Sequence, residues 1–285
     1  MTGFALKKEL TAVLANAGVE DAAFEAQQLL CHVTGKDSAA WLLTQNEPLD
    51  AGVREQLDAL LHRRLSGEPL QYLLGQWDFF GAPFLVGDGV LIPRPETEAL
   101  CETVIDAIRR DERPVVFDLC AGSGCIGLTV KRCVPQARVC LFEKFDPALV
   151  WLNRNRELHG LTRDVSVFQG DVLRGANLFS SLPRPDVIVS NPPYVESGAL
   201  PTLQKEVRRE PQTALDGGKD GLAFYRCFAD SWYDFLKDGG LFAVECGDEQ
   251  AEAVAGLFLA RGADVEIKYD FNHIPRFVIA RKEPT

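Results

Sequence analysis

The chain has 285 residues, of which 46% are apolar and 25% charged, and its 30 basic and 41 acidic side chains give a formal net charge of −11. These proportions exclude collagen, coiled coil and wholesale disorder, and an acidic surface opposes binding to phosphate backbones. No run of about 18 apolar residues predicts a membrane span, and the first residues contain no long apolar stretch of a secretory signal.

Residues 1–67 are expected to form a small helical domain. Apolar residues recur with a helical period, and capping residues predict helices near 3–16, 21–34 and 38–44. A fourth helix has the clearest stripe and lies between Asp50 and Gly67. Its stripe consists of Val53, Leu57, Leu60, Leu61 and Leu65.

Residues 68–95 are rich in Gly, Pro and aromatic residues and predict a hairpin that links two domains. Short strands are expected at Trp77–Phe80 and Phe84–Val86, around a turn at Gly81 and Pro83. A helix should follow Pro95, from about residue 96 to residue 110.

From residue 114 onward, apolar strands alternate with helical patterns. This alternation predicts an α/β domain over 96–285 with a parallel sheet covered by helices on both faces. The last two strands are separated by a short loop and should pair antiparallel. The expected strands are 115–119, 138–143, 165–169, 186–190, 240–246, 264–270 and 276–281, and the expected helices are 124–133, 146–159, 221–237 and 248–260.

The eight cysteines show no C-x-x-C spacing. Four of them lie at positions 120, 125, 133 and 140, a spacing that fits no zinc pattern. We therefore expect no metal site, and reduced thiols in a cytoplasmic protein.

The first chemical motif is the loop after the strand 115–119. It contains Gly122-x-Gly124-x-x-Gly127, and Glu143 follows about 20 residues later, which literally matches a dinucleotide fingerprint. An NAD-dependent oxidoreductase is therefore one interpretation, and a tight turn without a ligand is another. However, Asp118 ends the strand and a longer loop follows it, which resembles the first motif of Rossmann-like S-adenosylmethionine (SAM) methyltransferases. In that interpretation the acidic residues suit a cationic sulfonium ligand.

The second motif is an apolar strand that runs into Asn191-Pro192-Pro193-Tyr194. Ligands of open α/β sheets bind at the carboxyl ends of strands, and two prolines remove two backbone donors. The Asn191 side-chain oxygen and the Pro192 carbonyl are then acceptors for a planar NH₂ group, on which Tyr194 can stack. This pair of motifs resembles methyltransferases that act on exocyclic base amines or glutamine side chains.

Three further segments extend the resemblance over the whole chain. They are Gly67–Gly75, the Pro93-Arg94-Pro95-Glu96-Thr97-Glu98 segment, and Glu210-Pro211 with Gly217-Gly218 and Asp220-Gly221. With the helical N-terminus and the hairpin, these segments resemble the HemK family of peptide chain release factor glutamine methyltransferases. The resemblance implies a seven-stranded Rossmann-like SAM domain over 96–285, a substrate-recognition domain over 1–67 and a linker over 68–95.

The resemblance also implies roles for individual residues. SAM would methylate the glutamine of a Gly-Gly-Gln motif in class I release factors. Asn191, Pro192, Pro193 and Tyr194 would bind the glutamine amide, and Asn191, Pro192 and Tyr194 would be catalytic. The residues expected to contact SAM are Asp118, Cys120, Ala121, Gly122, Ser123, Gly124, Glu143 at the ribose, Asp171 and Val172 near the adenine, and Asn191.

Two positions depart from the family pattern. The family often has Gly at position 120, so Cys120 would be strained if this position requires a positive φ. The family usually has Asp where this chain has Glu143. Arg94 and Glu96 are expected either at the active site or in a salt bridge, and Arg208, Arg209 and Glu210 in a solvated charge cluster.

Other functions stay open at this point. A nucleic-acid adenine methyltransferase and a ribosomal-protein glutamine methyltransferase share the Asn-Pro-Pro-Tyr chemistry, although the charge of −11 opposes nucleic-acid binding. A non-catalytic binding module with the same fold is a further alternative.

Overall fold

The computed structural model describes residues 1–284, which divide into two compact units. The N-terminal unit comprises Met1–Gln76 and Lys205–Arg209, and the C-terminal unit comprises Trp77–Gln204 and the chain from Glu210 onward. The segment 68–95, expected as a separate linker, is shared between the units. Phe79 and Phe84 of the hairpin lie in the core of the C-terminal unit, because burying these rings stabilises the hairpin there.

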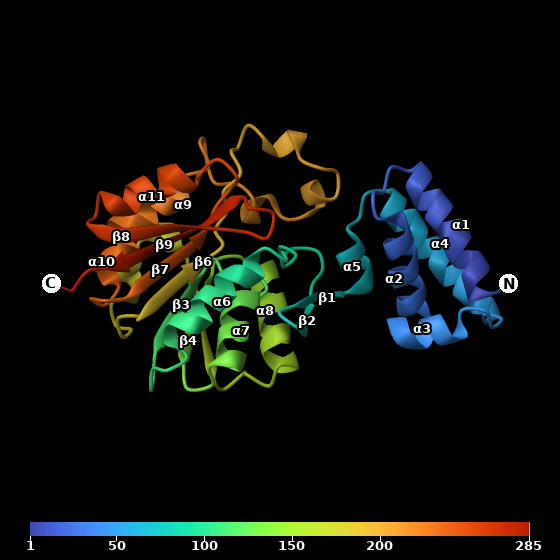
Figure 1. Cartoon of the computed structure of the whole chain (residues 1–285), viewed down its shortest axis with the longest axis horizontal. Coiled ribbons are helices and arrows are strands. Elements are labelled where there is room, and N and C mark those ends of the chain that lie inside the picture. The colour runs from blue at the N-terminus through green and yellow to red at the C-terminus, as the bar shows by residue number, and fades with distance from the viewer. Residues whose placement is uncertain (285) are drawn as a thin grey trace. The chain divides into compact units, whose positions relative to one another are not determined.

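The N-terminal unit is built from five helices (Figure 1). Thr2 and Asp37 cap α1 and α3 by accepting hydrogen bonds from the backbone N–H groups of Ala5 and Ala40. Gly35 ends α2 in the left-handed conformation. The helices are α1 (Gly3–Asn16), α2 (Ala22–Thr34), α3 (Ser38–Thr44), α4 (Ala51–Leu65) and α5 (Leu70–Leu74).

Helix α4 does not bury the stripe that its sequence predicts. Leu57 is fully buried, but Leu65 is 39% exposed, and Arg64 is only 6% exposed in its place. The guanidinium of Arg64 donates to Glu25 on α2 and to Glu206, within the same unit. A polar residue takes the inward position because two carboxylates satisfy its charge.

The sheet of the C-terminal unit has seven strands in the order β5-β4-β3-β6-β7-β9-β8. The first five are parallel, and β9 is antiparallel to both of its neighbours, which confirms the expected sheet. The strands are β3 (Val115–Leu119), β4 (Arg138–Glu143), β5 (Val165–Gln169), β6 (Val187–Ser190), β7 (Leu241–Glu245), β8 (Ala263–Tyr269) and β9 (Pro275–Lys282). The separate hairpin pairs β1 (Gln76–Phe79) with β2 (Ala82–Leu85), and its turn is Phe80-Gly81, where both residues have positive φ.

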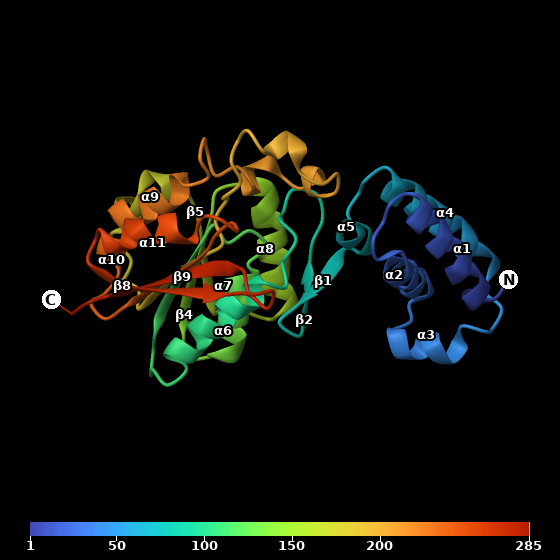
Figure 2. The ribbon, with the colours of Figure 1, turned by 45° about the horizontal axis from the view of Figure 1, so that its top comes forward.

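Helices cover both faces of the sheet (Figure 2). One face carries α6 (Thr97–Ile108), α7 (Cys125–Cys133) and α8 (Asp146–Leu158). The other carries α9 (Ala223–Cys227), α10 (Tyr233–Phe235) and α11 (Ala251–Leu259). The single helix expected over 221–237 is interrupted by the π-helical segment Phe228–Trp232. Short 3₁₀ helices lie at Val172–Arg174, Ala176–Phe179, Leu200–Thr202, Val207–Arg209 and Gln212–Ala214.

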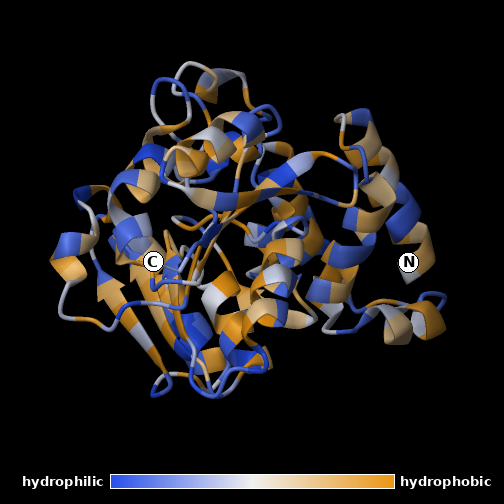
Figure 3. Cartoon of the chain, turned by 60° about the vertical axis from the view of Figure 1, so that its left-hand side comes forward, coloured by the Kyte–Doolittle hydropathy of each residue, from blue (hydrophilic) through white to orange (hydrophobic). Residues whose placement is uncertain are grey.

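The central strands β3, β6 and β7 are buried on both faces of the sheet, so they are apolar along nearly their whole length (Figure 3). Alternation still decides what each residue meets. Val116 packs in the cluster on the α7 side, whereas Phe117 and Leu119 pack in the cluster on the α11 side. Asp118 therefore shares the face of Val116 and points toward α7. No helix within residues 1–284 is both long and apolar enough to cross a membrane.

Candidate active site

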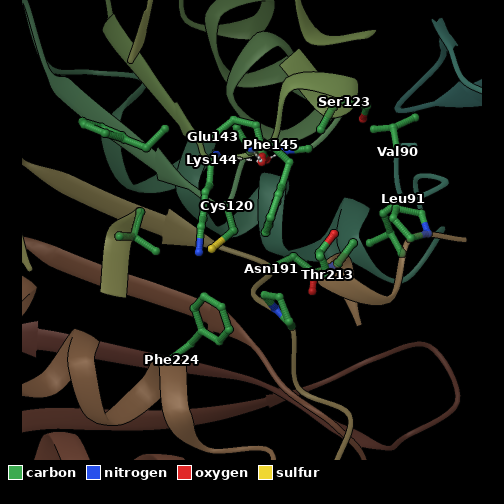
Figure 4. A pocket seen from close by; sticks show the side chains of 18 of the residues that line it. Val90, Leu91, Cys120, Ser123, Glu143, Lys144, Phe145, Asn191, Thr213 and Phe224 are labelled. Carbon is green, nitrogen blue, oxygen red and sulfur yellow. Dashed lines mark hydrogen bonds between the residues drawn. The ribbon is translucent and has the colours of Figure 1, made fainter. Parts of the chain in front are cut away.

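A cavity of about 370 Å³ opens at the carboxyl ends of β3, β4 and β6. The strand order reverses here, since β4 and β6 flank β3 on opposite sides, and such crevices are where open α/β sheets bind ligands. Figure 4 shows Cys120, Lys144, Asn191 and Phe224 around one space. Of the predicted site residues, the cavity wall contains Cys120, Ala121, Gly122, Ser123, Glu143, Asp171, Val172, Asn191 and Pro193.

The loop after β3 turns sharply into α7. Cys120, Gly122 and Gly124 have φ of 61°, 55° and 81°, so three of five consecutive residues occupy the left-handed region. Cys120 thus adopts the conformation in which a side chain is strained, the case anticipated for a non-glycine residue at this position. A Cβ added at Gly122 would meet nothing within 4 Å, because this face of the loop borders the cavity.

Asp118 lies beneath this loop and outside the cavity wall. Its side chain is fully buried, and its Oδ2 atom accepts a hydrogen bond of 2.9 Å from the backbone N–H of Gly127. Burial raises the pKa of Asp118 to about 7. The carboxyl group therefore holds the first turn of α7, and with it the loop that leads into the helix. Asp118 is predicted to contact SAM, but in the structure its side chain does not reach the cavity.

Glu143 ends β4 and borders the cavity next to the glycine loop. Its two carboxylate oxygens accept three backbone hydrogen bonds, from Gly122 at 2.9 Å, Lys144 at 2.7 Å and Phe145 at 2.8 Å. Burial raises the pKa of Glu143, and the three donors oppose that rise. The longer side chain, compared with aspartate, spans the gap between β4 and the loop after β3.

Asp171 and Val172 follow β5 on the same edge of the sheet. Asp171 accepts a hydrogen bond from Leu173 and forms an ion pair of 2.9 Å with Lys144. Burial raises the pKa of Asp171, but hydrogen bonds from Lys144 and Leu173 outweigh it and lower the pKa overall. Val172 is buried and adds an apolar surface to the cavity.

Asn191 begins the loop after β6. Its Nδ2 atom donates to the Oγ1 atom of Thr97 over 3.2 Å. Pro193 also borders the cavity, whereas Pro192 is buried and Tyr194 packs against the apolar cluster on the α11 side. The backbone oxygen of Tyr194 accepts from Gln250, and burial raises the pKa of the Tyr194 hydroxyl.

Glycines let a second loop lie against this tetrapeptide. A Cβ on Gly217 would come within 2.7 Å of the Tyr194 Cα, and one on Gly221 within 2.4 Å of the Tyr194 backbone oxygen. Val195 donates a backbone hydrogen bond to Leu215 in the same contact. The segment after Glu210 therefore has a local role: it braces the loop that carries Asn191.

Two features of the site do not follow from any pattern in the sequence. The first is Thr97, which links Asn191 to the buried carboxylate of Glu245 at the end of β7. The second is Glu210, expected in a solvated charge cluster but buried. Glu210 accepts from the backbone N–H of Ile92 and forms an ion pair with Arg94, so Arg94 both borders the cavity and anchors its wall. Only the tertiary contact between segments far apart in sequence reveals these pairs.

The charged side chains of the cavity wall are largely paired. Arg94 and Lys144 are its cations, and they pair with Glu210 and Asp171. All eight cysteines are free thiols, and within residues 1–284 no three or more His, Cys, Asp or Glu side chains gather as a group that could hold a metal ion.

Comparison with known proteins finds relatives that match most of the chain. Residues 5–75 match the family described as the PrmC N-terminal domain, and residues 96–219 match the methyltransferase small domain. The release factor glutamine methyltransferase of Geobacter sulfurreducens is 40% identical over 273 residues, covering 94% of this chain and 92% of that protein. The release factor glutamine methyltransferase of Thermodesulfovibrio yellowstonii is 35% identical over 264 residues, covering 90% of this chain and 92% of that protein.

A solved structure supports the fold. A methyltransferase from Pyrococcus furiosus shares 18% identity with a TM-score of 0.54, covering 72% of this chain and 91% of that chain. The two release factor glutamine methyltransferases, and not this structure, confirm the family resemblance carried by the sequence motifs. The chain belongs to the release factor glutamine methyltransferase family.

Proposed function

We propose that this protein transfers a methyl group from SAM to the side-chain amide nitrogen of the glutamine in the Gly-Gly-Gln motif of class I peptide chain release factors. The observation that carries the proposal is the position of Asn191. Its side chain borders the same cavity as the glycine loop and Glu143, so a cofactor and an amide substrate can meet there. The family membership supplies the substrate class.

The donor set of the cavity fits SAM better than a dinucleotide. Glu143 and Asp171 offer carboxylate oxygens to hydroxyl and ammonium groups, and Phe142, Val172 and Phe224 offer apolar surface to a purine ring. Both cations of the cavity wall are already ion-paired, which leaves little for a pyrophosphate. SAM, when bound, would supply a methyl group on a positively charged sulfur.

The residues that would hold SAM follow from this fit. The loop from Cys120 to Gly124 would contact the methionine part, Glu143 the ribose, and Asp171 with Val172 the adenine. Asp118 would act through the loop that it braces, since its carboxyl group is buried below the cavity. The literal glycine fingerprint then serves the backbone turn rather than a pyrophosphate.

Asn191 and Pro192 would bind the glutamine amide. An amide nitrogen is a weak nucleophile, because its lone pair is delocalised into the carbonyl. Two acceptors, the Asn191 side-chain oxygen and the Pro192 carbonyl, would take the two N–H hydrogens and aim the nitrogen at the methyl group. The ring of Tyr194 packs against the cluster on the α11 side and outside the cavity wall, so Tyr194 would support the loop that carries Asn191. The amide proton would leave to water after transfer.

The N-terminal unit would contribute to binding the release factor. It carries exposed apolar side chains, among them Phe4, Leu42 and Leu43. Such side chains would offer apolar contacts to a protein substrate. The reaction would take place in the cytoplasm, where thiols such as the eight in this chain stay reduced.

Transfer of a labelled methyl group tests the proposal. The enzyme is incubated with methyl-labelled SAM and a purified class I release factor, beside the same factor with its motif glutamine replaced by alanine. We expect label on the first factor and none on the second. Equal label on both factors, or label only on added ribosomal protein or nucleic acid, would overturn the assigned substrate.

A further inference from the structure

The side-chain amide of Asn191 has two nearly equal ends, and only one of them suits an amide substrate. An oxygen directed into the cavity can accept from the substrate NH₂ group, whereas an NH₂ group directed there would oppose it. The two orientations have almost the same shape, so packing alone discriminates poorly between them. Some hydrogen-bond partner must select one.

Thr97 is that partner. The Asn191 Nδ2 atom donates to the Thr97 Oγ1 atom over 3.2 Å, and the Thr97 hydroxyl donates to the Glu245 Oε2 atom over 2.6 Å. Thr97 and Glu245 are each only 2% exposed, so these hydrogen bonds are largely shielded from water. The three side chains form one hydrogen-bonded chain from the cavity into the core.

The fold places these residues together for simple reasons. Leu241 and Ala243 of β7 pack on the α6 side of the sheet, and alternation puts Glu245 on the same side. Thr97 is the first residue of α6, which crosses that side. Asn191 follows β6, the strand next to β7. The hydrogen bonds among these three side chains therefore join the N-terminus of α6 to the ends of β6 and β7.

The available hydrogens determine which side chain donates and which accepts in each of these hydrogen bonds. An ionised carboxylate only accepts, so Glu245 takes the single hydroxyl hydrogen of Thr97. The Thr97 oxygen can then only accept from Asn191, which draws the NH₂ end of the amide toward Thr97. The Oδ1 end is left to face the substrate.

We propose that Thr97 and Glu245 are positioning residues that orient the Asn191 amide with its oxygen toward the substrate glutamine. This inference rests on the proposed function, because it assigns the direction of a group that the substrate amide would meet. Neither residue needs to touch the reacting atoms. Each acts through Asn191.

The hydrogen bonds that join Asn191, Thr97 and Glu245 also predict that turnover depends on pH. Burial raises the pKa of Glu245 to about 7, while the Thr97 hydroxyl and the guanidinium groups of Arg276 and Arg94 oppose the rise. A protonated Glu245 can donate to Thr97, which frees the Thr97 hydrogen to point at Asn191 and removes the preference for one amide orientation. Turnover should therefore fall on the acid side of pH 7.

The ionisable groups around Glu245 come from every neighbouring segment. Glu96 raises its pKa further, Arg94 is held by Glu210, and Arg276 is held by Asp248 and Asp270. The other groups that interact electrostatically with Glu245 are Tyr194, Tyr225, Cys125 and Cys246. The pKa values of all four lie above that of Glu245, so none of them titrates with it. Asp118 also has a pKa of about 7, and the Glu245→Gln variant below separates its effect from that of Glu245.

The experiment compares Thr97→Val, which removes the hydroxyl at nearly constant shape, with Thr97→Ser, which keeps it. Thr103→Val is the matched control, since Thr103 lies on the same helix and outside the cavity wall. Measured quantities are kcat and KM for the release factor, the Kd of SAM, Tm, and kcat from pH 5.5 to 9. We expect Thr97→Val to lower kcat about tenfold, the size of one lost oriented hydrogen bond, with the Kd of SAM unchanged.

Thr97→Ser should recover most of that loss, and Thr103→Val should keep the wild-type kcat. Glu245→Gln provides a second measurement that does not depend on the folding of Thr97→Val: its acid limb near pH 7 should vanish, because a glutamine does not titrate. Equal kcat for Thr97→Val and Thr97→Ser, or an unchanged acid limb in Glu245→Gln, would overturn the inference. A wild-type enzyme that fails to methylate the release factor would instead overturn the proposed function, so the two failures are distinct.

Discussion

The backbone N–H of Gly127 donates a 2.9 Å hydrogen bond to the carboxyl group of Asp118, which joins α7 to β3. The other oxygen of Asp118, Oδ1, has no hydrogen-bond partner among residues 1–284 and is buried. The carboxyl group is therefore supported on one side only. Because burial also raises the pKa of this carboxyl group to about 7, we expect the core beneath the glycine loop to respond to pH.

Asp118→Asn should change how stability depends on pH. The pKa of Asp118 is raised by burial to about 7 in the folded protein, above its ordinary 3.8, so its contribution to stability is present at low pH and is lost as pH rises through 7. Asparagine can keep the bond from Gly127 and does not titrate. Between pH 5 and pH 8 the wild type should lose about 2.5 kcal/mol relative to the variant.

Thermal or urea unfolding of both proteins at pH 5, 6, 7 and 8 measures this difference. Glu245 titrates in the same range, but it is common to both proteins and cancels in the comparison. A stability difference that stays constant from pH 5 to pH 8 would show that Asp118 does not titrate there.

Gly127→Ala should destabilise the fold through overpacking. A Cβ at this position would lie 2.2 Å from the Leu141 Cδ2 atom and 3.0 Å from the Asp118 Oδ2 atom. We expect a loss of about 2 kcal/mol in the free energy of unfolding. Gly256→Ala on α11 is the control, because a Cβ there meets nothing within 4 Å, and it should stabilise by about 0.5 kcal/mol. Equal effects of the two changes would contradict the packing explanation.

Arg64→Leu should destabilise the N-terminal unit. The substitution leaves Glu25, whose side chain is 12% exposed, without its buried partner. Removing one member of a buried ion pair costs about 3 kcal/mol, which calorimetry of the full chain can measure. Arg54 lies on the same helix as Arg64, and Arg54→Leu removes its two ion pairs, with Glu9 and Asp58. All three of these side chains are exposed, so this change should affect stability much less. An equally small effect at Arg64 would mean that its ion pairs do not stabilise the unit.

Asn191→Ala and Glu143→Ala should have opposite kinetic signatures. Loss of the Asn191 acceptor should lower kcat by about 100-fold and leave the Kd of SAM nearly unchanged. Loss of the Glu143 carboxylate should weaken SAM binding by about tenfold, because a hydroxyl acceptor and a brace of the glycine loop disappear together. Isothermal titration with SAM and steady-state methyl transfer separate the two effects. If Asn191→Ala weakened SAM binding as much as turnover, its assigned role would be wrong.

Much of the fold can be predicted from local pattern. The strands Val115–Leu119, Arg138–Glu143 and Val165–Gln169 appear with their expected bounds, because short apolar runs between turn residues have few other solutions. Helices α1, α2 and α3 match to within a residue for the same reason, since caps such as Thr2 and Asp37 mark their ends. Cys120 has a positive φ, which is the case in which a non-glycine residue at this position is expected to be strained.

Local sequence pattern mispredicts the burial of a residue when that residue pairs with a partner far away in the sequence. Leu65 and Arg64 exchange their expected exposures because Glu25 and Glu206 neutralise the arginine. Glu210 looks like part of a charged surface run, yet it is buried by its bonds to Ile92 and Arg94. Hydropathy assigns a charged residue to solvent, and only an opposite charge supplied by another segment reverses that assignment.

The sequence by itself determined the succession of strands and helices along the chain and the family to which the chain belongs. It also determined the two loops that meet at the carboxyl ends of the strands. These features depend on periodicity and on short motifs. Only the tertiary structure decided that Asp118 accepts a hydrogen bond from Gly127 of α7, and that Asn191 is hydrogen-bonded through Thr97 to Glu245. Residues 97, 191 and 245 come from three separate elements. Their hydrogen bonds exist only after the sheet and α6 have packed, so no local pattern in the chain encodes them.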